Sequence, residues 1–197
     1  MTEKEKMLAG MLYNSMADES LVNERQNAKR LCREYNTADP LDEQKRHEIM
    51  LSILGSTKEN FRIEQPFLCD YGYNIEIGEN FYANYNLTVL DCAKVTIGDN
   101  VFIAPNVGIY TAGHPLTAQQ RNSGLEYAYP IIIGNNVWIG AGVHICPGVT
   151  IGDNVVIGAG SVVVKDIPEN ALACGVPCKV IRYITEDDVM PEKEPFC

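Results

Sequence analysis

A six-residue period governs much of the second half of this chain. From Ile133 the sequence divides into the units IGNNVW, IGAGVH, ICPGVT, IGDNVV and IGAGSV, each headed by isoleucine and followed by a small residue. Such a period fits neither an α-helix with 3.6 residues per turn nor a plain strand with alternating side chains. It fits a solenoid of short parallel strands that turns every six residues. We therefore predict a mainly β protein built as a β-solenoid.

The period extends upstream and is interrupted once. Isoleucine recurs at positions 97, 103 and 109, and a weaker copy surrounds Ile77. The stretch TAGHPLTAQQRNSGLEYAYP then loses the period and carries His114, one of only three histidines. A segment that leaves a solenoid can place functional side chains above a rigid wall. We predict a protruding loop over residues 110–130.

The first 60 residues follow a helical pattern instead. Leu21, Arg25 and Ala28 recur at spacings of three and four, which is typical of one face of a helix. In the segment TADPLDEQKRHEIMLSIL, Asp39 is expected to be the N-cap that precedes Pro40. We predict two or three helices here.

These periods divide the chain into three parts. We expect a helical segment at residues 1–60, a β-helix domain at residues 61–185 that carries the loop, and a C-terminal tail at residues 186–197.

The charge balance limits the partners. Sixteen basic and 26 acidic residues give a formal net charge of −10, which does not favour nucleic acid or an anionic membrane. No signal peptide or membrane-spanning apolar run is evident. Seven scattered cysteines without a CxxC motif or a Cys/His cluster indicate reduced thiols and no metal site. We expect a cytoplasmic protein that binds neither nucleic acid nor membrane.

Two polar residues are candidates for chemistry on their residue type. An imidazole titrates near neutrality, so His114 could take a proton from an alcohol and pass it on; the alternative is a loop histidine without a role. Asn84 in FYAN could stabilise an oxyanion. From the residues alone, the better interpretation of Asn84 is a turn residue at a solenoid corner.

The sequence resembles the hexapeptide-repeat acyltransferases, and within them the maltose/galactoside O-acetyltransferases. The resemblance is carried by EKEKMLAGMLYNSMADESL, CDYGYNIEIGENFYANYNLTVLD, IGDNVFIAPNVGIYTAGHP, RNSGLEY and the C-terminal repeats up to VIR. The loop is closer to the maltose branch. The resemblance implies a left-handed parallel β-helix, a homotrimer with active sites between subunits, and acetyl-CoA as co-substrate without a permanently bound cofactor.

The resemblance also implies roles for individual residues. His114 matches the general base, and Asn84 the residue that stabilises the oxyanion and touches the acyl donor. We further expect the Glu126 carboxylate to orient His114. The positions that match the sugar pocket, with Glu126 added, are Asp18, Asp70, Tyr82, Asn84, Asp91 and Glu126. The positions expected along acetyl-CoA are Asn84, Ala141, Ala159, Val164, Lys165, Lys179 and Arg182. To these we add Trp138, the sole tryptophan, as a wall of the site; the alternative is core packing or a subunit contact.

The sequence therefore predicts direct acetyl transfer from acetyl-CoA to a sugar hydroxyl, by resemblance often the 6-hydroxyl, with maltose or glucose as acceptors. Cys92 stands where the galactoside branch has a second acid, which weighs against a galactoside. Three alternatives stay open: another small alcohol or amine as acceptor, a silent solenoid scaffold, and a covalent cysteine mechanism. A metal enzyme on the same fold is disfavoured because the three histidines, His47, His114 and His144, lack ligand spacing.

Overall fold

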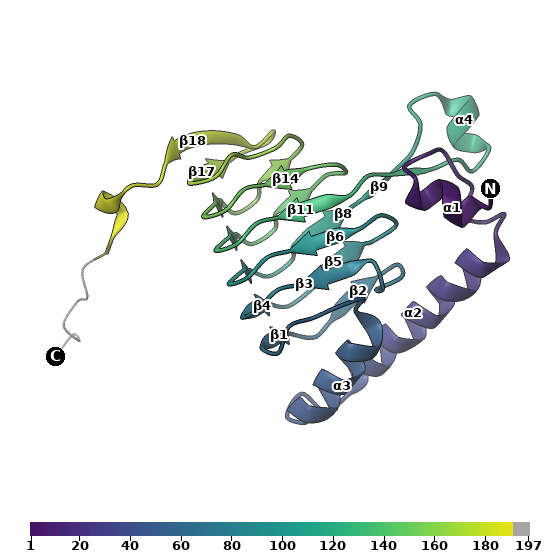
Figure 1. Cartoon of the computed structure of the whole chain (residues 1–197), viewed down its shortest axis with the longest axis horizontal. Helices are drawn as coiled ribbons and strands as arrows, with labels where there is room; N and C mark the ends of the chain where they lie inside the picture. The colour runs from purple at the N-terminus through teal and green to yellow at the C-terminus, as the bar shows by residue number, and fades with distance from the viewer. Residues whose placement is uncertain (191–197) are drawn as a thin grey trace.

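The computed structural model describes residues 1–190, and residues 191–197 of the predicted tail lie outside the described part. Residues 61–183 wind into a parallel β-helix, and the N-terminal helices lie along one side and one end of it (Figure 1). The prediction of a hexapeptide β-solenoid is confirmed.

Three sheets form the faces of the β-helix, and the chain visits them in turn. The first face contains β1 (Phe61–Ile63), β4 (Phe81–Ala83), β7 (Phe102–Ile103), β12 (Trp138–Ile139), β15 (Val156–Ile157) and β17 (Ala171–Cys174), with β18 (Lys179–Tyr183) added antiparallel. The second face contains β2 (Phe67–Cys69), β5 (Leu87–Leu90), β8 (Gly108–Tyr110), β13 (His144–Ile145) and β16 (Val162–Val163). The third contains β3 (Ile75–Ile77), β6 (Val95–Ile97), β11 (Ile131–Ile133) and β14 (Thr150–Ile151). We call the turn from first to second face the first corner, and the turn from second to third face the second corner.

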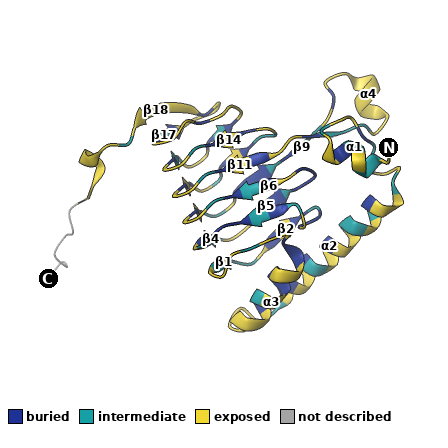
Figure 2. Ribbon diagram, in the orientation of Figure 1, coloured by how far each residue is buried: buried dark blue, intermediate teal, exposed yellow. Residues whose placement is uncertain are grey.

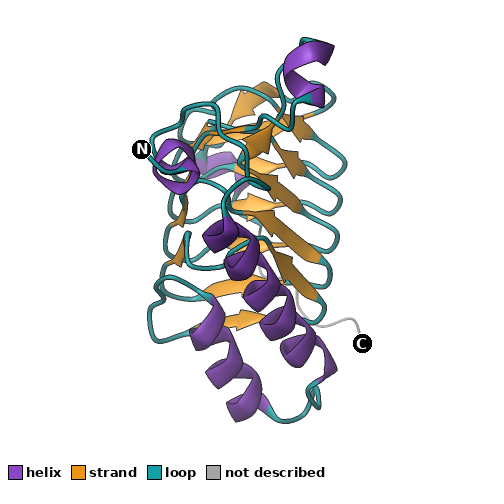
Figure 3. Cartoon of the chain, turned by 90° about the vertical axis from the view of Figure 1, so that its right-hand side faces the viewer, coloured by secondary structure: helices purple, strands orange, loops and turns teal. Residues whose placement is uncertain are grey.

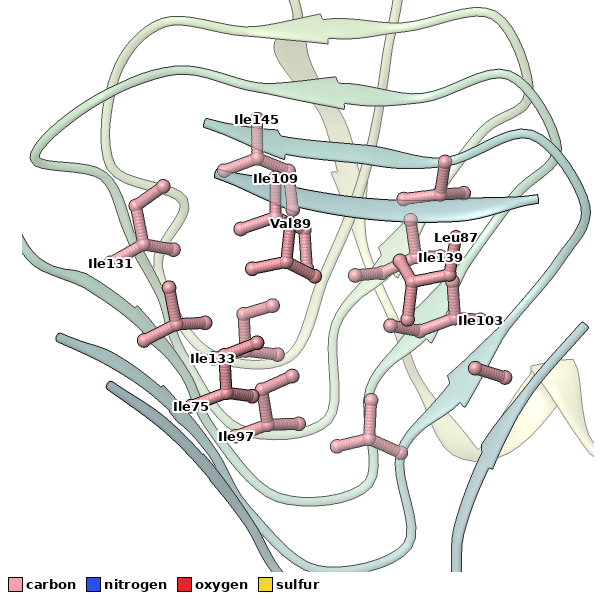
Figure 4. Packing of buried hydrophobic residues seen from close by; sticks show 14 of the residues in the cluster. Ile75, Leu87, Val89, Ile97, Ile103, Ile109, Ile131, Ile133, Ile139 and Ile145 are labelled. Carbon is pink, nitrogen blue, oxygen red and sulfur yellow. The ribbon is translucent and has the colours of Figure 1, made fainter. Parts of the chain in front are cut away.

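The repeated isoleucines fill the interior. On the third face Ile97, Ile133 and Ile151 pair in register and are at most 3 % exposed. Figure 4 shows such side chains from the three faces converging on the axis, and Figure 2 shows the buried residues following it. A branched side chain every six residues therefore builds one continuous apolar column.

Asparagines make many of the turns possible. Asn80, Asn100 and Asn136 adopt positive φ values of 55–56°, a region that asparagine tolerates better than most residues. Their side-chain amides form a ladder, with Nδ2 of Asn80 donating to Oδ1 of Asn100 at 2.9 Å and Asn100 to Asn136 at 3.2 Å. The same residue type thus shapes each turn and links it to the next.

The N-terminal helices are α1 (Glu3–Leu8), α2 (Glu19–Thr37) and α3 (Glu43–Ile53). Figure 3 shows α2 and α3 lying across the β-helix, and α2 packs on β2. Asp39 is not the N-cap of α3 as predicted. Its carboxylate accepts the Leu41 N–H in a local turn, and Asp42 caps the helix through the Lys45 N–H.

The loop leaves the β-helix without disturbing it. The chain departs after β8 and returns with Ile131 in register with Val95 on the coil below. Between these points β9 (Ala112–Gly113) pairs with β10 (Tyr127–Ala128), and α4 (Ala118–Asn122) forms the tip. A short 3₁₀ helix, η1 (Glu186–Asp188), follows β18. Within residues 1–190, none of the helices has the length and apolarity that crossing a membrane requires.

Neighbouring residues of β11 provide a matched test of the core. Ile133 is 1 % exposed, whereas Ile132 points outward and is 46 % exposed. We expect Ile133→Ala to lower the free energy of unfolding by about 2–5 kcal/mol, and Ile132→Ala by less than about 1 kcal/mol. Urea unfolding of both variants at one protein concentration tests this. Equal effects would contradict an interior column.

Candidate functional site

His114 projects from the start of the loop, where its ring is exposed. Its Nδ1 lies 3.1 Å from the Leu125 carbonyl oxygen. Because a carbonyl can only accept, this contact places the proton of the neutral imidazole on Nδ1. The lone pair of Nε2 is therefore free to take a proton.

Glu126 does not orient His114 by direct contact as predicted. Its carboxylate accepts the Tyr13 hydroxyl at 3.1 Å and the Ser15 hydroxyl at 2.7 Å. The backbone groups of Tyr13 and Glu126 also pair in both directions. Glu126 therefore joins the N-terminal segment to the loop.

Asp70 lies at the second corner beside the N-terminal segment. Burial raises the pKa of its carboxyl, and the Cys92 thiol donates to Oδ2 at 3.4 Å. Nearby, the Arg25 guanidinium donates to the Tyr71 hydroxyl at 2.8 Å. This corner thus combines a buried thiol and a buried phenol with one guanidinium and the partly exposed Asp70 carboxyl, and the carboxyl is the group that can accept from a hydroxyl.

Asp91 does not have the position of a sugar ligand. Its side chain is fully buried, and the backbone N–H groups of Asp70, Tyr71 and Asn74 donate to its carboxylate at 3.1, 2.8 and 3.3 Å. The structure thus corrects the prediction for this residue. Asp91 holds the second corner in shape and so fixes Asp70.

Asp18 is the N-cap of α2. Its Oδ1 accepts the backbone N–H of Ser20 at 3.0 Å and the Ser20 hydroxyl at 2.6 Å. The Lys4 N–H approaches Oδ2 at 3.3 Å. These contacts place Asp18 at the junction of the N-terminal segment and α2, but they also supply a structural reason for an acid at this position.

The other predicted residues lie elsewhere. Asn84 follows β4 at the first corner, where its Oδ1 accepts the Tyr85 N–H at 2.8 Å. That bond leaves the NH₂ end of the amide available as a donor. The interpretation of Asn84 as a turn residue is therefore correct, and its role toward an oxyanion stays a prediction.

A column of outward-facing aromatic rings runs along the first face beside Asn84. Tyr82 is in register with Phe102, and Phe102 with Trp138. Trp138 is 55 % exposed, so it is not part of the interior. Ala141 and Ala159 follow β12 and β15 at the first corner and are exposed, with the Gly160 N–H donating to the Ala141 carbonyl at 2.8 Å.

The other residues expected along acetyl-CoA do not form one cluster on a single chain. Val164 and Lys165 follow β16 at the second corner, whereas Lys179 and Arg182 lie on β18 beside the first face. All four are exposed. Arg182 donates to the Asp188 carboxylate at 2.7 Å, so that ion pair must open or be shared if Arg182 binds an anion.

The residues predicted for the acceptor and the transfer step are therefore separated on one chain. His114 and Glu126 lie on the loop that leaves at the second corner, Asp70 lies at that corner, and Asp18 lies at the start of α2. Asn84, Ala141 and Ala159 lie at the first corner, beside Tyr82 and Trp138 on the first face. A cavity of about 410 Å³ lies between α3 and β1, and none of these residues lines it. Among residues 1–190, no three His, Cys, Asp or Glu side chains are grouped to hold a metal ion.

Several residues near His114 escaped the sequence prediction. Tyr13 and Ser15 are at most 4 % exposed, and Arg25 donates to the Ser15 carbonyl at 3.1 Å. One feature of the sequence could have indicated Arg25, because it is a charged residue on the apolar face of α2. Tyr13 carried no such signal, since its partner is 113 positions away.

Comparisons with known proteins agree with this architecture. Residues 6–58 match the maltose acetyltransferase hexapeptide capping motif, and residues 130–165 match the bacterial transferase hexapeptide (six repeats). Together with the three-faced β-helix, these matches define a hexapeptide-repeat transferase.

Three relatives narrow this class. Galactoside O-acetyltransferase of Escherichia coli K12 is 50 % identical over 93 % of this chain and 90 % of its own length. The crystal structure of a maltose O-acetyltransferase from Clostridium difficile 630 superposes with a TM-score of 0.92 at 57 % identity, covering 94 % of this chain and 99 % of that one. A galactoside acetyltransferase in complex with coenzyme A gives 0.94 at 48 % identity, covering 100 % and 98 %. The chain belongs to the maltose/galactoside acetyltransferase family.

The burial of Asp91 predicts a pH effect on stability. Burial raises the pKa of its carboxyl from 3.8 to about 6 in the folded protein, so the folded state binds a proton more tightly than the unfolded state. Asp91 therefore stabilises the fold most below about pH 4, and this contribution is lost as the pH rises to about 6. The difference between the unfolded and folded pKa values of Asp91 corresponds to roughly 3 kcal/mol of unfolding free energy.

Asp91→Asn keeps the side-chain volume and one acceptor oxygen but cannot titrate. We expect the unfolding free energy of the wild type, minus that of the variant, to fall between pH 4 and pH 6. Chemical unfolding of both proteins across this range measures the difference, and other titrating groups cancel. A constant or rising difference would be evidence against the raised pKa.

Proposed function

We propose that this protein transfers an acetyl group from acetyl-CoA to a hydroxyl, by family resemblance the 6-hydroxyl, of maltose, glucose or a related sugar. The observation that carries this proposal is the Nδ1 contact of His114 with a carbonyl, on a loop above a hexapeptide β-helix. Family membership supports the acetyltransferase class, and the coenzyme A complex of a relative supports the donor.

His114 acts as the general base. Its Nε2 takes the proton of the sugar hydroxyl as the oxygen attacks the thioester carbonyl, and a sulfur–carbon bond breaks when the tetrahedral intermediate collapses. The imidazolium then returns the proton to the departing CoA thiolate. The Leu125 carbonyl accepts from Nδ1 throughout, so the ring keeps its orientation in both protonation states.

Asn84 stabilises the oxyanion. Its amide oxygen is occupied by the Tyr85 N–H, so the NH₂ group can donate to the negative oxygen of the intermediate. Direct transfer is favoured over an acyl-cysteine because burial and the neighbouring Asp70 charge raise the pKa of Cys92. A thiol held protonated is a poor nucleophile.

The site is assembled between two copies in a homotrimer. The acceptor groups near His114 and the donor groups near Asn84 lie at different corners of one chain, so a second copy would bring them together. The outward-facing column of the partly exposed Tyr82 and the exposed Phe102 and Trp138 is an apolar surface that a neighbouring subunit would cover.

The second corner supports a neutral sugar as acceptor. The Asp70 carboxyl at this corner and the Asp18 carboxylate at the start of α2 are partly exposed and can accept hydrogen bonds from sugar hydroxyls. A buried polar group left unpaired costs a few kcal/mol, so hydroxyl placement gives selectivity. The rates of CoA release with maltose, glucose and a β-galactoside rank these sugars as acceptors.

His114→Ala tests the general base. We expect the acetyl-CoA-dependent release of CoA with maltose or glucose to fall by about 10²-fold or more, because general-base catalysis contributes that factor. Assays with maltose, glucose, a β-galactoside and no sugar measure it. Unchanged turnover in the variant would exclude His114 as the base. Activity on none of the sugars would favour another acceptor or a scaffold.

Mixed oligomers test the shared site. Asn84→Ala removes an oxyanion donor and should lower kcat by roughly 10²-fold. When His114→Ala and Asn84→Ala chains are co-expressed with different tags, about one quarter of the sites in randomly mixed trimers combine an intact His114 with an intact Asn84. We expect the mixed protein to regain activity in that proportion. No recovery in a mixed oligomer would place both residues in one subunit.

A further inference from the structure

We propose that Glu126 is a positioning residue that sets the tautomer of His114 through the peptide bond between Leu125 and Glu126. The inference rests on His114 as the general base. Neither carboxylate oxygen faces the imidazole; they accept the hydroxyls of Tyr13 and Ser15. The connection to His114 runs through the backbone.

The two ends of one peptide group make the connection. The C=O of Leu125 accepts from Nδ1 of His114 at 3.1 Å, and the N–H of Glu126 donates to the Tyr13 carbonyl at 2.9 Å. These C=O and N–H groups belong to the same planar peptide unit, so fixing one fixes the direction of the other. The Tyr13 backbone thus aims the Leu125 carbonyl at His114.

The Glu126 side chain keeps the Tyr13 backbone in that place. Besides the two hydroxyl bonds, the Tyr13 N–H donates to the Glu126 carbonyl at 3.0 Å. Tyr13 is fully buried and Ser15 is 4 % exposed, so these bonds are shielded from water. The segment Tyr13–Ser15 and the loop therefore form one clasp, which we call the N-terminal clasp.

The clasp has a chemical consequence. With the Leu125 carbonyl in place, the neutral ring carries its proton on Nδ1 and presents Nε2 as the base. If the carbonyl swings away, the ring can turn or take the other tautomer, and the fraction of chains ready to accept a proton falls. Glu126 then acts on kcat without touching substrate.

Glu126→Ala opens the clasp. We expect kcat to fall about tenfold, less than the loss of ~10² or more for the base itself, with the KM for acetyl-CoA nearly unchanged. Glu126→Gln keeps an acceptor oxygen for one hydroxyl and should retain most of the activity. Gln119→Ala, an exposed change on α4 in the same loop, is the matched control and should behave as wild type.

A double-mutant cycle separates positioning from general loss of structure. In a His114→Ala background, Glu126→Ala should have no further effect on kcat, because its action passes through the imidazole. Equal losses in both backgrounds, or no loss in the wild-type background, would overturn the proposal. If His114→Ala itself loses no activity, the proposed general base fails instead. These two failures are distinguishable.

Nitrogen NMR of ¹⁵N-histidine-labelled protein gives a readout that is independent of turnover. We expect neutral His114, identified by its absence in His114→Ala, to carry the proton on Nδ1 in wild type and to show a tautomer mixture in Glu126→Ala. If Glu126→Ala does not fold, Ser15→Ala removes one clasp bond and should shift the tautomer in the same direction. A wild-type ring protonated on Nε2, or one unchanged in the folded variant, would overturn the proposal.

Discussion

The pairing of each coil with the coil below it is the constraint on which the rest of the molecule depends. The Gly98 N–H donates to the Ile133 carbonyl and the Gly134 N–H to the Ile151 carbonyl, both at 2.8 Å, so each turn inherits its height and direction from its neighbour. Short strands of two to four residues would be unstable alone. When these strands stack in register, they form rigid sheets, and corner residues such as Asn84 project from them at fixed positions.

The loop is stabilised by a different core. Met7, Tyr13 and Leu21 from the N-terminal region pack with Tyr71, Cys92, Ala93 and Ala128 in a cluster separate from the axial column. The chain returns from the loop to the β-helix with Ile131 paired in register with Val95 of the coil below. The residues of the loop therefore do not change the stacking of the coils. The position of His114 is therefore set by the N-terminal segment rather than by the repeat.

The repeat explains how much could be predicted. Isoleucine every six residues defines the coils, and the loss of that period marks the loop, because both are local properties of the sequence. The carboxylates were less tractable. The residue type alone does not separate an aspartate that accepts backbone N–H groups, such as Asp91, from one that binds a sugar. Only the burial of the side chain distinguishes the two. Asp39 was mistaken for the cap of α3 because Asp42 offers the same chemistry three residues later.

Glu126 shows why direct contact was the wrong expectation. A carboxylate beside a catalytic histidine is a familiar arrangement, but here the imidazole partner is a backbone carbonyl, which no side-chain pattern reveals. The carbonyl carries no charge, so it fixes the tautomer without stabilising the imidazolium as strongly as a carboxylate would. In the proposed mechanism, an imidazolium that is less stabilised returns its proton more readily to the leaving thiolate, and the neutral imidazole is correspondingly a weaker base than one paired with a carboxylate.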